Sequence, residues 1–311
     1  MSGGALLSAW ERGLQRRQPL LDERDVLRLL HDEDPQVRCD RYGDVCWFYW
    51  YGDGPPGADD LNGFAALTAT VGAGHWHARA MRNQAHQPEE VNLWSSSRAP
   101  VEWVVSEDEI RYQLSSERGQ SPGLFLDQRD NRRWVHDHAP DGEILNLFAY
   151  TGSFAFAALR GGARGSVNVD VSQRYLAWTE GNAGINGLAG RVETAAVDAR
   201  RFLAGSARRG RTFDAIVCDP PSFSRPRKRE ESVFQVERDL PPLVTAGLEV
   251  LNPGGWMLVS SNYEGWSAEQ FRCAVQRGAR GRAELMNAPG SGADFEAACE
   301  LTLLKSAILR C

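Results

Sequence analysis

The sequence predicts an α/β fold: a Rossmann-like, doubly wound, mostly parallel seven-stranded sheet with an antiparallel edge hairpin, preceded by a smaller N-terminal α+β domain. Two patterns predict it. From residue 144 onward, short apolar runs alternate with helical patterns, as in sheets whose parallel strands are joined by crossover helices. Before that point, strand and helix patterns follow one another without such regularity. The 311 residues suffice for two domains, which we expect over residues 1–115 and 116–311.

The N-terminal part predicts a mixed set of elements. Helical patterns cover residues 7–17 and 23–31, a strand covers 45–51, one or two helices fall within 58–82, a polar linker spans 83–100, and a hairpin joins 101–105 to 110–114. The strand over 45–51 carries the aromatic run WFYWY. Successive strand residues face opposite sides, so at most one face of this run could stack on bases. We expect it to pack in a core.

The second half predicts the doubly wound sheet. Strands are expected at residues 144–148, 166–170, 192–197, 213–219, 256–260, 282–287 and 299–309. Helices are expected at residues 154–160, 173–186, 199–207, 233–251 and 268–277, the fourth ending at an Asn-Pro-Gly-Gly turn. No helical pattern separates the last two strands, so we expect them to be antiparallel.

Ligands of such sheets bind beyond the carboxyl ends of the strands. These ends bring together residues 149–153, Asp170, Asp198 and Asp219-Pro220-Pro221. An acid at the place of Asp170 commonly accepts hydrogen bonds from ribose hydroxyls, the role we favour. The alternative is a helix N-cap, because Ser172 and a helix follow. Asp198 either accepts from an adenine amino group or caps the next helix, and the sequence leaves both open.

The loop after the first strand argues against a pyrophosphate site. It has one glycine, Gly152, where dinucleotide sites have GxGxxG, and the chain contains no GxxxxGK[ST] motif. NAD and nucleoside triphosphates are therefore disfavoured. A ligand with an adenosine but no phosphates fits better, and S-adenosylmethionine is the obvious one.

The segment CDPPSFS places an acid, two prolines and an aromatic residue at the end of an apolar run. Prolines fix the backbone and remove N–H donors, so carbonyl groups and the Asp219 carboxylate are left as acceptors. A planar base could stack on Phe223 while its polar edge meets those acceptors. We therefore take Asp219, Pro220, Pro221 and Phe223 as candidate catalytic residues. The alternative is a rigid turn with a core phenylalanine.

Four segments, LNLFAYTGSF, VNVDVS, FDAIVCDPPSFS and LNPGGWMLVSSN, resemble class I methyltransferases in order and spacing. With GLFLDQRDNRR at 123–133 and residues 26–45, the chain more closely resembles the bacterial group that methylates large-subunit ribosomal RNA at cytosine carbon-5 or guanine N7. The resemblance covers about residues 25–311 and implies that Phe125, Asp127 and Arg129 help to close the cofactor site. The candidate cofactor residues are Phe125, Asp127, Arg129, Asn146, Phe148, Tyr150, Thr151, Gly152, Ser153, Asp170, Ser172, Asp198 and Asp219.

The chain departs from the carbon-5 members of that group. Cytosine carbon-5 chemistry needs a cysteine thiolate that adds to the ring. In those members a cysteine pair lies in the strand after the Asn-Pro-Gly-Gly turn, where this chain has Val259-Ser260-Ser261-Asn262. Cys218 is expected to pack in the sheet. We therefore expect methylation of a base nitrogen, guanine N7 or an exocyclic amine, achieved mainly by positioning.

The net charge of −6 argues against a protein that coats nucleic acid but allows a local basic patch. Arg225, Arg227, Lys228 and Arg229 follow the candidate catalytic loop and are candidate phosphate contacts for an RNA substrate. The alternative is a solvated loop, because two glutamates follow. A methyltransferase for a small aromatic metabolite or a protein side chain is the second reading, and a silent RNA-binding scaffold the third.

The remaining features set limits. The six cysteines show neither a CxxC pair nor the spacing of a metal site, so we expect reduced thiols and no metal. No stretch approaches the roughly 18 apolar residues of a membrane helix, and the first residues do not read as a secretory signal. We expect a cytoplasmic protein without membrane contact. The oligomeric state stays open.

Overall fold

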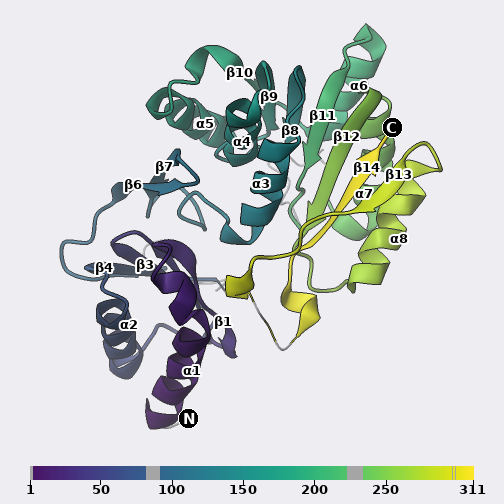
Figure 1. Ribbon diagram of the computed structural model, residues 1–311. Helices are drawn as coiled ribbons and strands as arrows, with labels where there is room; N and C mark the ends of the chain where they lie inside the picture. The colour runs from purple at the N-terminus through teal and green to yellow at the C-terminus, as the bar shows by residue number, and fades with distance from the viewer. Residues whose placement is uncertain (1–2, 82–91, 223–233, 296, 298) are drawn as a thin grey trace. The chain divides into compact units, whose positions relative to one another are not determined.

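The computed structural model describes residues 3–81, 92–222, 234–295, 297 and 299–311. Contacts divide the chain into two compact units, Met1–Leu126 with Ala293–Ala298, and Asp127–Gly292 with Cys299–Cys311. The chain thus leaves the second unit after Gly292 and returns to it at Cys299 (Figure 1).

The first unit is built on a five-stranded sheet in the order β1-β2-β3-β4-β5. Its strands are β1 (Val26–Asp34), β2 (Val37–Tyr42), β3 (Val45–Trp50), β4 (His75–Ala80) and β5 (Leu93–Ser95). β3 and β4 run parallel, and the other neighbours run antiparallel. The unit also contains α1 (Gly3–Leu21), α2 (Ala58–Thr70), the hairpin of β6 (Glu102–Glu107) and β7 (Ile110–Ser115), and the short helix η4 (Ala293–Phe295).

The aromatic run of β3 packs in the core, as expected, because the strand is buried along its whole length. Phe48 stacks on Phe64 of α2 with ring centroids 4.3 Å apart. Trp10 of α1 stacks on the same ring, with centroids 6.1 Å apart. The two helices and the sheet therefore share one apolar cluster.

Three expectations for this unit are wrong. Residues 26–31, expected to be helical, belong to β1, and residues 75–80, placed within expected helices, form β4. The segment 83–100, expected as a linker, contains β5. In β1 the pairing with β2 shifts between Arg28 and Leu30, so the consecutive residues Leu29 and Leu30 both reach the core. This irregularity removes the alternation that marks a strand, and a short apolar run of that kind fits a helix equally well.

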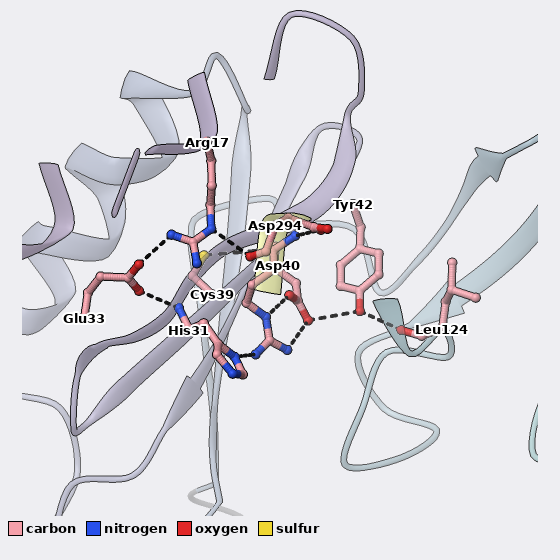
Figure 2. A network of polar contacts seen from close by, with 9 residues as sticks. Arg17, His31, Glu33, Cys39, Asp40, Tyr42, Leu124 and Asp294 are labelled. Carbon is pink, nitrogen blue, oxygen red and sulfur yellow. Dashed lines mark hydrogen bonds and ion pairs between the residues drawn. The ribbon is translucent and has the colours of Figure 1, made fainter. Parts of the chain in front are cut away.

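The segment at η4 is built into the first unit by polar contacts (Figure 2). The backbone N–H of Arg28 donates to Asp294 Oδ2 at 2.9 Å, and Arg17 Nε donates to the Asp294 carbonyl at 2.9 Å. The Arg28 guanidinium pairs with Asp40 and lies 4.7 Å from the ring centroid of Phe295. Asp294 and Phe295 are both buried.

The second unit confirms the predicted fold class. Its seven-stranded sheet has the order β10-β9-β8-β11-β12-β14-β13. The strands are β8 (Glu143–Leu147), β9 (Gly165–Asp170), β10 (Val192–Ala196), β11 (Phe213–Cys218), β12 (Leu251–Ser261), β13 (Glu284–Asn287) and β14 (Lys305–Arg310). Neighbours from β10 to β12 are parallel, and β14 is antiparallel to both β12 and β13. The order reverses between β8 and β11, which is where ligands bind in such sheets.

Helices cover both faces of this sheet (Figure 1). They are α3 (Arg129–Asp137), α4 (Ser153–Gly161), α5 (Gln173–Ile185), α6 (Ala199–Arg209), α7 (Val236–Leu248) and α8 (Ala268–Ala279). Apolar residues of α6, α7 and α8 form one core with the sheet, and α3, α4 and α5 lie on its other side. None of the helices in the described part of the chain combines the length and apolar character needed to cross a bilayer.

The helix expected over 233–251 is observed over Val236–Leu248, and α3 was not expected. The starts of two strands differ most from the expectation. The Asn-Pro-Gly-Gly segment, expected as a turn, belongs to β12, because Gly254 N–H donates to the Cys311 carbonyl at 3.0 Å and Cys311 N–H to the Gly255 carbonyl at 3.1 Å. The strand expected over 299–309 begins only at Lys305, after the short helix η5 (Glu300–Thr302).

Candidate cofactor and catalytic site

The loop between β8 and α4 has an unusual backbone. Phe148 and Tyr150 have φ angles of 57° and 50°, and Gly152 has φ 86°. A Cβ at Gly152 would lie 2.6 Å from Cγ2 of Thr179, so the site requires glycine by both conformation and space. Backbone strain of this kind costs free energy and persists where surrounding structure holds it, often at ligand sites.

Helix α5 holds this loop in place. Thr179 Oγ1 donates to the Tyr150 carbonyl at 2.9 Å, and Asn182 Nδ2 donates to the Thr151 carbonyl at 3.3 Å. The Tyr150 ring packs edge-on against Tyr175, with centroids 4.7 Å apart. Contacts with α5 therefore support the loop conformation.

Asp170 links the loops that follow the first two strands of the unit. Its Oδ2 accepts from the Tyr150 N–H at 3.1 Å, and its Oδ1 accepts from the Ser172 N–H at 2.8 Å. Ser172 is the N-cap of α5, and its Oγ accepts from the Tyr175 N–H at 3.4 Å. The capping role that the sequence allowed for Asp170 thus belongs to Ser172.

Asp198 caps α6. Its carboxylate accepts from the N–H groups of Arg200 and Arg201 and pairs with the Arg200 guanidinium, with Nη2 2.9 Å from Oδ2. Partial burial acts to raise the pKa of Asp198, but the hydrogen bonds and charge of Arg200 outweigh it and lower the pKa. Of the two roles that the sequence left open for Asp198, adenine acceptor or helix cap, the structure shows the helix cap.

Asn146 lies inside the sheet. It is buried in β8, and its Nδ2 donates to Asn168 Oδ1 on β9 at 2.9 Å. Asn168 in turn donates to Ser166 Oγ at 3.1 Å. The amide of Asn146 therefore ties two strands together below the rim, whereas Phe148 and Ser153 lie in the loop and at the start of α4.

Asp219 follows β11 directly, at the switch point of the sheet. Ser260 Oγ of β12 donates to Asp219 Oδ1 at 2.6 Å. Burial raises the pKa of Asp219 to about 6, and the charge of Asp127 acts in the same direction. Hydrogen bonds from Ser260 and Gln128 and the charge of Arg132 oppose that rise. The carboxyl is thus largely ionised at neutral pH but titrates close to it.

The residues after Asp219 are described only in part. Pro220 is buried and Pro221 is exposed. Ser222 Oγ donates to Asn262 Oδ1 at 3.1 Å, which ties this segment to the end of β12. The other candidates of the segment lie outside the described residues: Phe223, Arg225, Arg227, Lys228 and Arg229.

Phe125, Asp127 and Arg129, which the family resemblance implies close the cofactor site, have different surroundings. Phe125 is 42% exposed and belongs to the first unit. Asp127 and Arg129 begin the second unit, where Arg129 is buried and the charge of Asp127 acts on Asp219.

Cys218 is structural, as expected. Its side chain is fully buried in the sheet, and burial and the neighbouring Asp219 charge raise the pKa of the thiol. Within the described ranges, no group of three or more His, Cys, Asp or Glu side chains is placed to hold a metal ion.

Two residues near Asp219 were not among the sequence-based candidates. Gln128 stood in the quoted GLFLDQRDNRR segment, and Ser260 was noted as replacing a cysteine. Their common contact with Asp219 appears only in three dimensions.

A model of S-adenosylmethionine-dependent methyltransferases matches residues 60–299 of the chain. The chain belongs to this methyltransferase family. S-adenosylmethionine is therefore its cofactor, and the geometry of the second unit fits it. The β8–α4 loop brings its backbone close to α5 through Gly152, without the glycine pattern of a pyrophosphate site.

The methyltransferase is similar to two curated bacterial proteins over part of its length. Ribosomal RNA large subunit methyltransferase K/L of Dichelobacter nodosus is 36% identical over 173 residues, and ribosomal RNA large subunit methyltransferase K of Neisseria meningitidis serogroup B is 34% identical over 168 residues. The matches cover 56% and 54% of this chain. They cover 23% and 47% of the relatives, so this methyltransferase matches less than half of either.

Solved structures agree with the fold of the methyltransferase. SMU.776, in complex with SAH, aligns with a TM-score of 0.85 and 23% identity over 100% of this chain and 82% of that chain. An S-adenosylmethionine-dependent methyltransferase of Streptococcus mutans aligns with a TM-score of 0.84 and 22% identity, with the same coverage. These alignments extend over both units.

Proposed function

We propose that this methyltransferase methylates a base nitrogen of RNA, with ribosomal RNA as the first candidate substrate. The observation that carries the proposal is the acceptor geometry at the switch point, where the Asp219 carboxylate precedes two prolines without N–H donors. The names of the relatives from Dichelobacter and Neisseria support ribosomal RNA. An enzyme with that substrate would act in the cytoplasm, where ribosomes are assembled.

The chain's own residues would hold the cofactor at the rim of the sheet. We assign it to the β8–α4 loop with Gly152, to Asp170 for the ribose hydroxyls, and to Asp198 beside the adenine, with Asp127 and Arg129 closing the site. The role that the resemblance implies for Phe125 stays a prediction. When bound, S-adenosylmethionine supplies an electrophilic methyl group. Asp170 keeps acceptor capacity for this role, because a carboxylate has roughly four acceptor positions and two N–H groups occupy part of them.

Asp219 would orient the target base. A carboxylate accepts hydrogen bonds from an exocyclic amine or ring N–H, and it thereby turns the nitrogen lone pair toward the methyl group. Phe223 would stack on the base, and Arg225, Arg227, Lys228 and Arg229 would contact phosphates; these roles remain predictions. A nitrogen with a lone pair needs no proton removed before transfer, so positioning is the main contribution of the protein.

The surroundings of Asp219 favour nitrogen over carbon-5. Addition to the cytosine ring requires a thiolate, whereas Cys218 is buried with a raised thiol pKa. Ser260, at the place of a cysteine in carbon-5 enzymes, donates a hydrogen bond to Asp219. A serine hydroxyl ionises far less readily than a thiol, so Ser260 is a poor substitute for that cysteine.

The second candidate keeps the cofactor and changes the substrate to a small aromatic metabolite or a protein side chain. The net charge of −6 favours it, because a long RNA is repelled by an acidic protein. The same acceptor set would orient an amine or ring nitrogen of such a substrate.

The deciding experiment offers S-adenosylmethionine with a labelled methyl group to the purified chain, together with total RNA from a strain that lacks its gene. We expect label in large-subunit RNA, and nucleoside analysis should identify an N-methylated base. RNA from the parent strain is the matched control, because its sites are already methylated. Absence of label in every RNA, with cofactor binding intact, would overturn the proposal in favour of the second candidate.

A further inference from the structure

Three hydrogen bonds form a chain that ends at Asp219. Asn131 Nδ2 donates to Gln128 Oε1 at 2.7 Å, Gln128 Nε2 donates to Ser260 Oγ at 3.1 Å, and Ser260 Oγ donates to Asp219 Oδ1 at 2.6 Å. Asn131, Gln128 and Ser260 are all buried. The contacts join α3 and the turn before it to β12 and the end of β11, all within the second unit.

The chain of bonds has one consistent direction. Because the Gln128 oxygen accepts from Asn131, its amide nitrogen is directed at Ser260 as a donor. The Ser260 oxygen accepts that bond, so its own proton is available for the carboxylate. Each of the three bonds is thus donated toward Asp219, whose Oδ1 accepts the last of them.

We infer that Gln128 and Ser260 are positioning residues that hold the Asp219 carboxylate as a fixed acceptor for the N–H edge of the substrate. The inference rests on the proposed function, in which Asp219 orients the target. Ser260 holds Oδ1 by a hydrogen bond. A carboxylate has roughly four acceptor positions, so capacity remains for a donor on the substrate.

The charges around Asp219 make this support necessary. Burial and the charge of Asp127 disfavour the ionised carboxylate, while Arg132 on α3 favours it. Hydrogen bonds from Ser260 and Gln128 favour it as well. Loss of either bond should therefore raise the pKa of Asp219 and leave more of the protonated form, in which an O–H donor replaces one acceptor position.

The first test measures Asp219 directly and needs no substrate. Carbon-13 NMR of the aspartate carboxyls gives the Asp219 titration in the full chain, assigned by its loss in Asp219→Asn. We expect Ser260→Ala and Gln128→Met to raise the midpoint by about one pH unit. Ser261→Ala is the matched control, since its neighbouring, buried hydroxyl accepts from Tyr263 N–H and makes no contact with Asp219 among the described residues; its midpoint should not move.

The second test is kinetic. In Ser260→Ala and Gln128→Met, kcat at pH 7 should fall about tenfold, and the acid limb of the pH profile should move upward with the Asp219 midpoint. The affinity for S-adenosylmethionine and the melting temperature should stay close to those of Ser261→Ala. A merely structural role would lower stability without moving the acid limb.

An unchanged midpoint of Asp219 in both variants would overturn the inference, whatever the substrate. A raised midpoint in an enzyme that methylates no RNA would sustain the network and refute only the proposed substrate.

Discussion

At the scale of the residue, Asp219 lies under opposing influences. Burial and Asp127 raise its pKa, and Ser260, Gln128 and Arg132 lower it, with the result that it titrates near 6. The sequence marked Asp219 because it ends an apolar run before two prolines. It could not mark Gln128 and Ser260 as a pair, because they are separated by 132 positions and meet only through side chains.

Replacing Asp219 tests its role in transfer. Asp219→Ala should abolish methyl transfer, because the target loses its fixed acceptor, and should leave the affinity for S-adenosylmethionine within about tenfold, or roughly 1.4 kcal/mol. Transfer of labelled methyl groups and calorimetric cofactor binding measure the two effects. Persistent transfer would show that the catalytic assignment is wrong.

The raised pKa of Asp219 gives a signed pH dependence. Activity should decline as pH falls through about 6, because protonation removes the negative charge of Asp219 and replaces one acceptor position with an O–H donor. For stability, the folded-state pKa lies above the unfolded value near 4. The contribution of protonated Asp219 to the free energy of unfolding is therefore fully present below about pH 4 and is lost as pH rises through about 6.

Asp219→Asn removes that dependence. The unfolding free energy of the variant minus that of the parent protein should rise by up to about 2 kcal/mol from pH 4.5 to pH 7.5. Urea unfolding at the two pH values measures it. A difference between the two proteins that is the same at both pH values would contradict the raised pKa.

At the scale of the element, regular strands were predictable and irregular ones were not. In the second unit, strands bounded by glycine or acid alternate with helices, and the predicted elements reappear with shifted ends. The strand β1 was not predicted, because its pairing shift brings the consecutive residues Leu29 and Leu30 into the same core. The start of β12 was predicted wrongly, because the Asn-Pro-Gly-Gly segment pairs through its backbone with Cys311, which is distant in sequence.

The β8–α4 loop provides a test at this scale. Gly152→Ala combines an unfavourable φ with a Cβ 2.6 Å from Thr179, so it should cost more than the roughly 1 kcal/mol of the conformation alone and weaken cofactor binding. Gly187→Ala is the matched control, with φ 69° and open space around the added Cβ. Thermal unfolding and cofactor titration measure both. Equal effects of the two substitutions would rule out the close approach as the reason for glycine.

At the scale of the whole molecule, the first unit is discontinuous in sequence. Residues 293–298 are grouped with it by contact, and Asp294 and Phe295 are among its buried residues. Sequence patterns describe contiguous stretches, so they could not show that a short segment near residue 294 belongs with β1. The division into domains at residues 1–115 and 116–311 stays a prediction.

Removing the Asp294 carboxylate should weaken the first unit selectively. Asp294→Ala removes the acceptor of the partly buried Arg28 N–H, which should cost about 1 kcal/mol. Hydrogen exchange should quicken in β1 and stay unchanged in β8 and β11. Asp141→Ala, at a side chain that is 91% exposed, serves as the control. Equal acceleration in both units would mean that the segment does not act on the first unit alone.

The late arrival of Asp294 and Phe295 also bears on how the protein is made. A ribosome synthesises residues 1–126 first, yet the acceptor for Arg28 and the ring beneath its guanidinium are not available until residue 295 has emerged. The usual order, in which the N-terminal domain folds while the rest is still being translated, is therefore incomplete here. Of the two units, the first is synthesised earlier and can be finished only after nearly all of the second has left the ribosome.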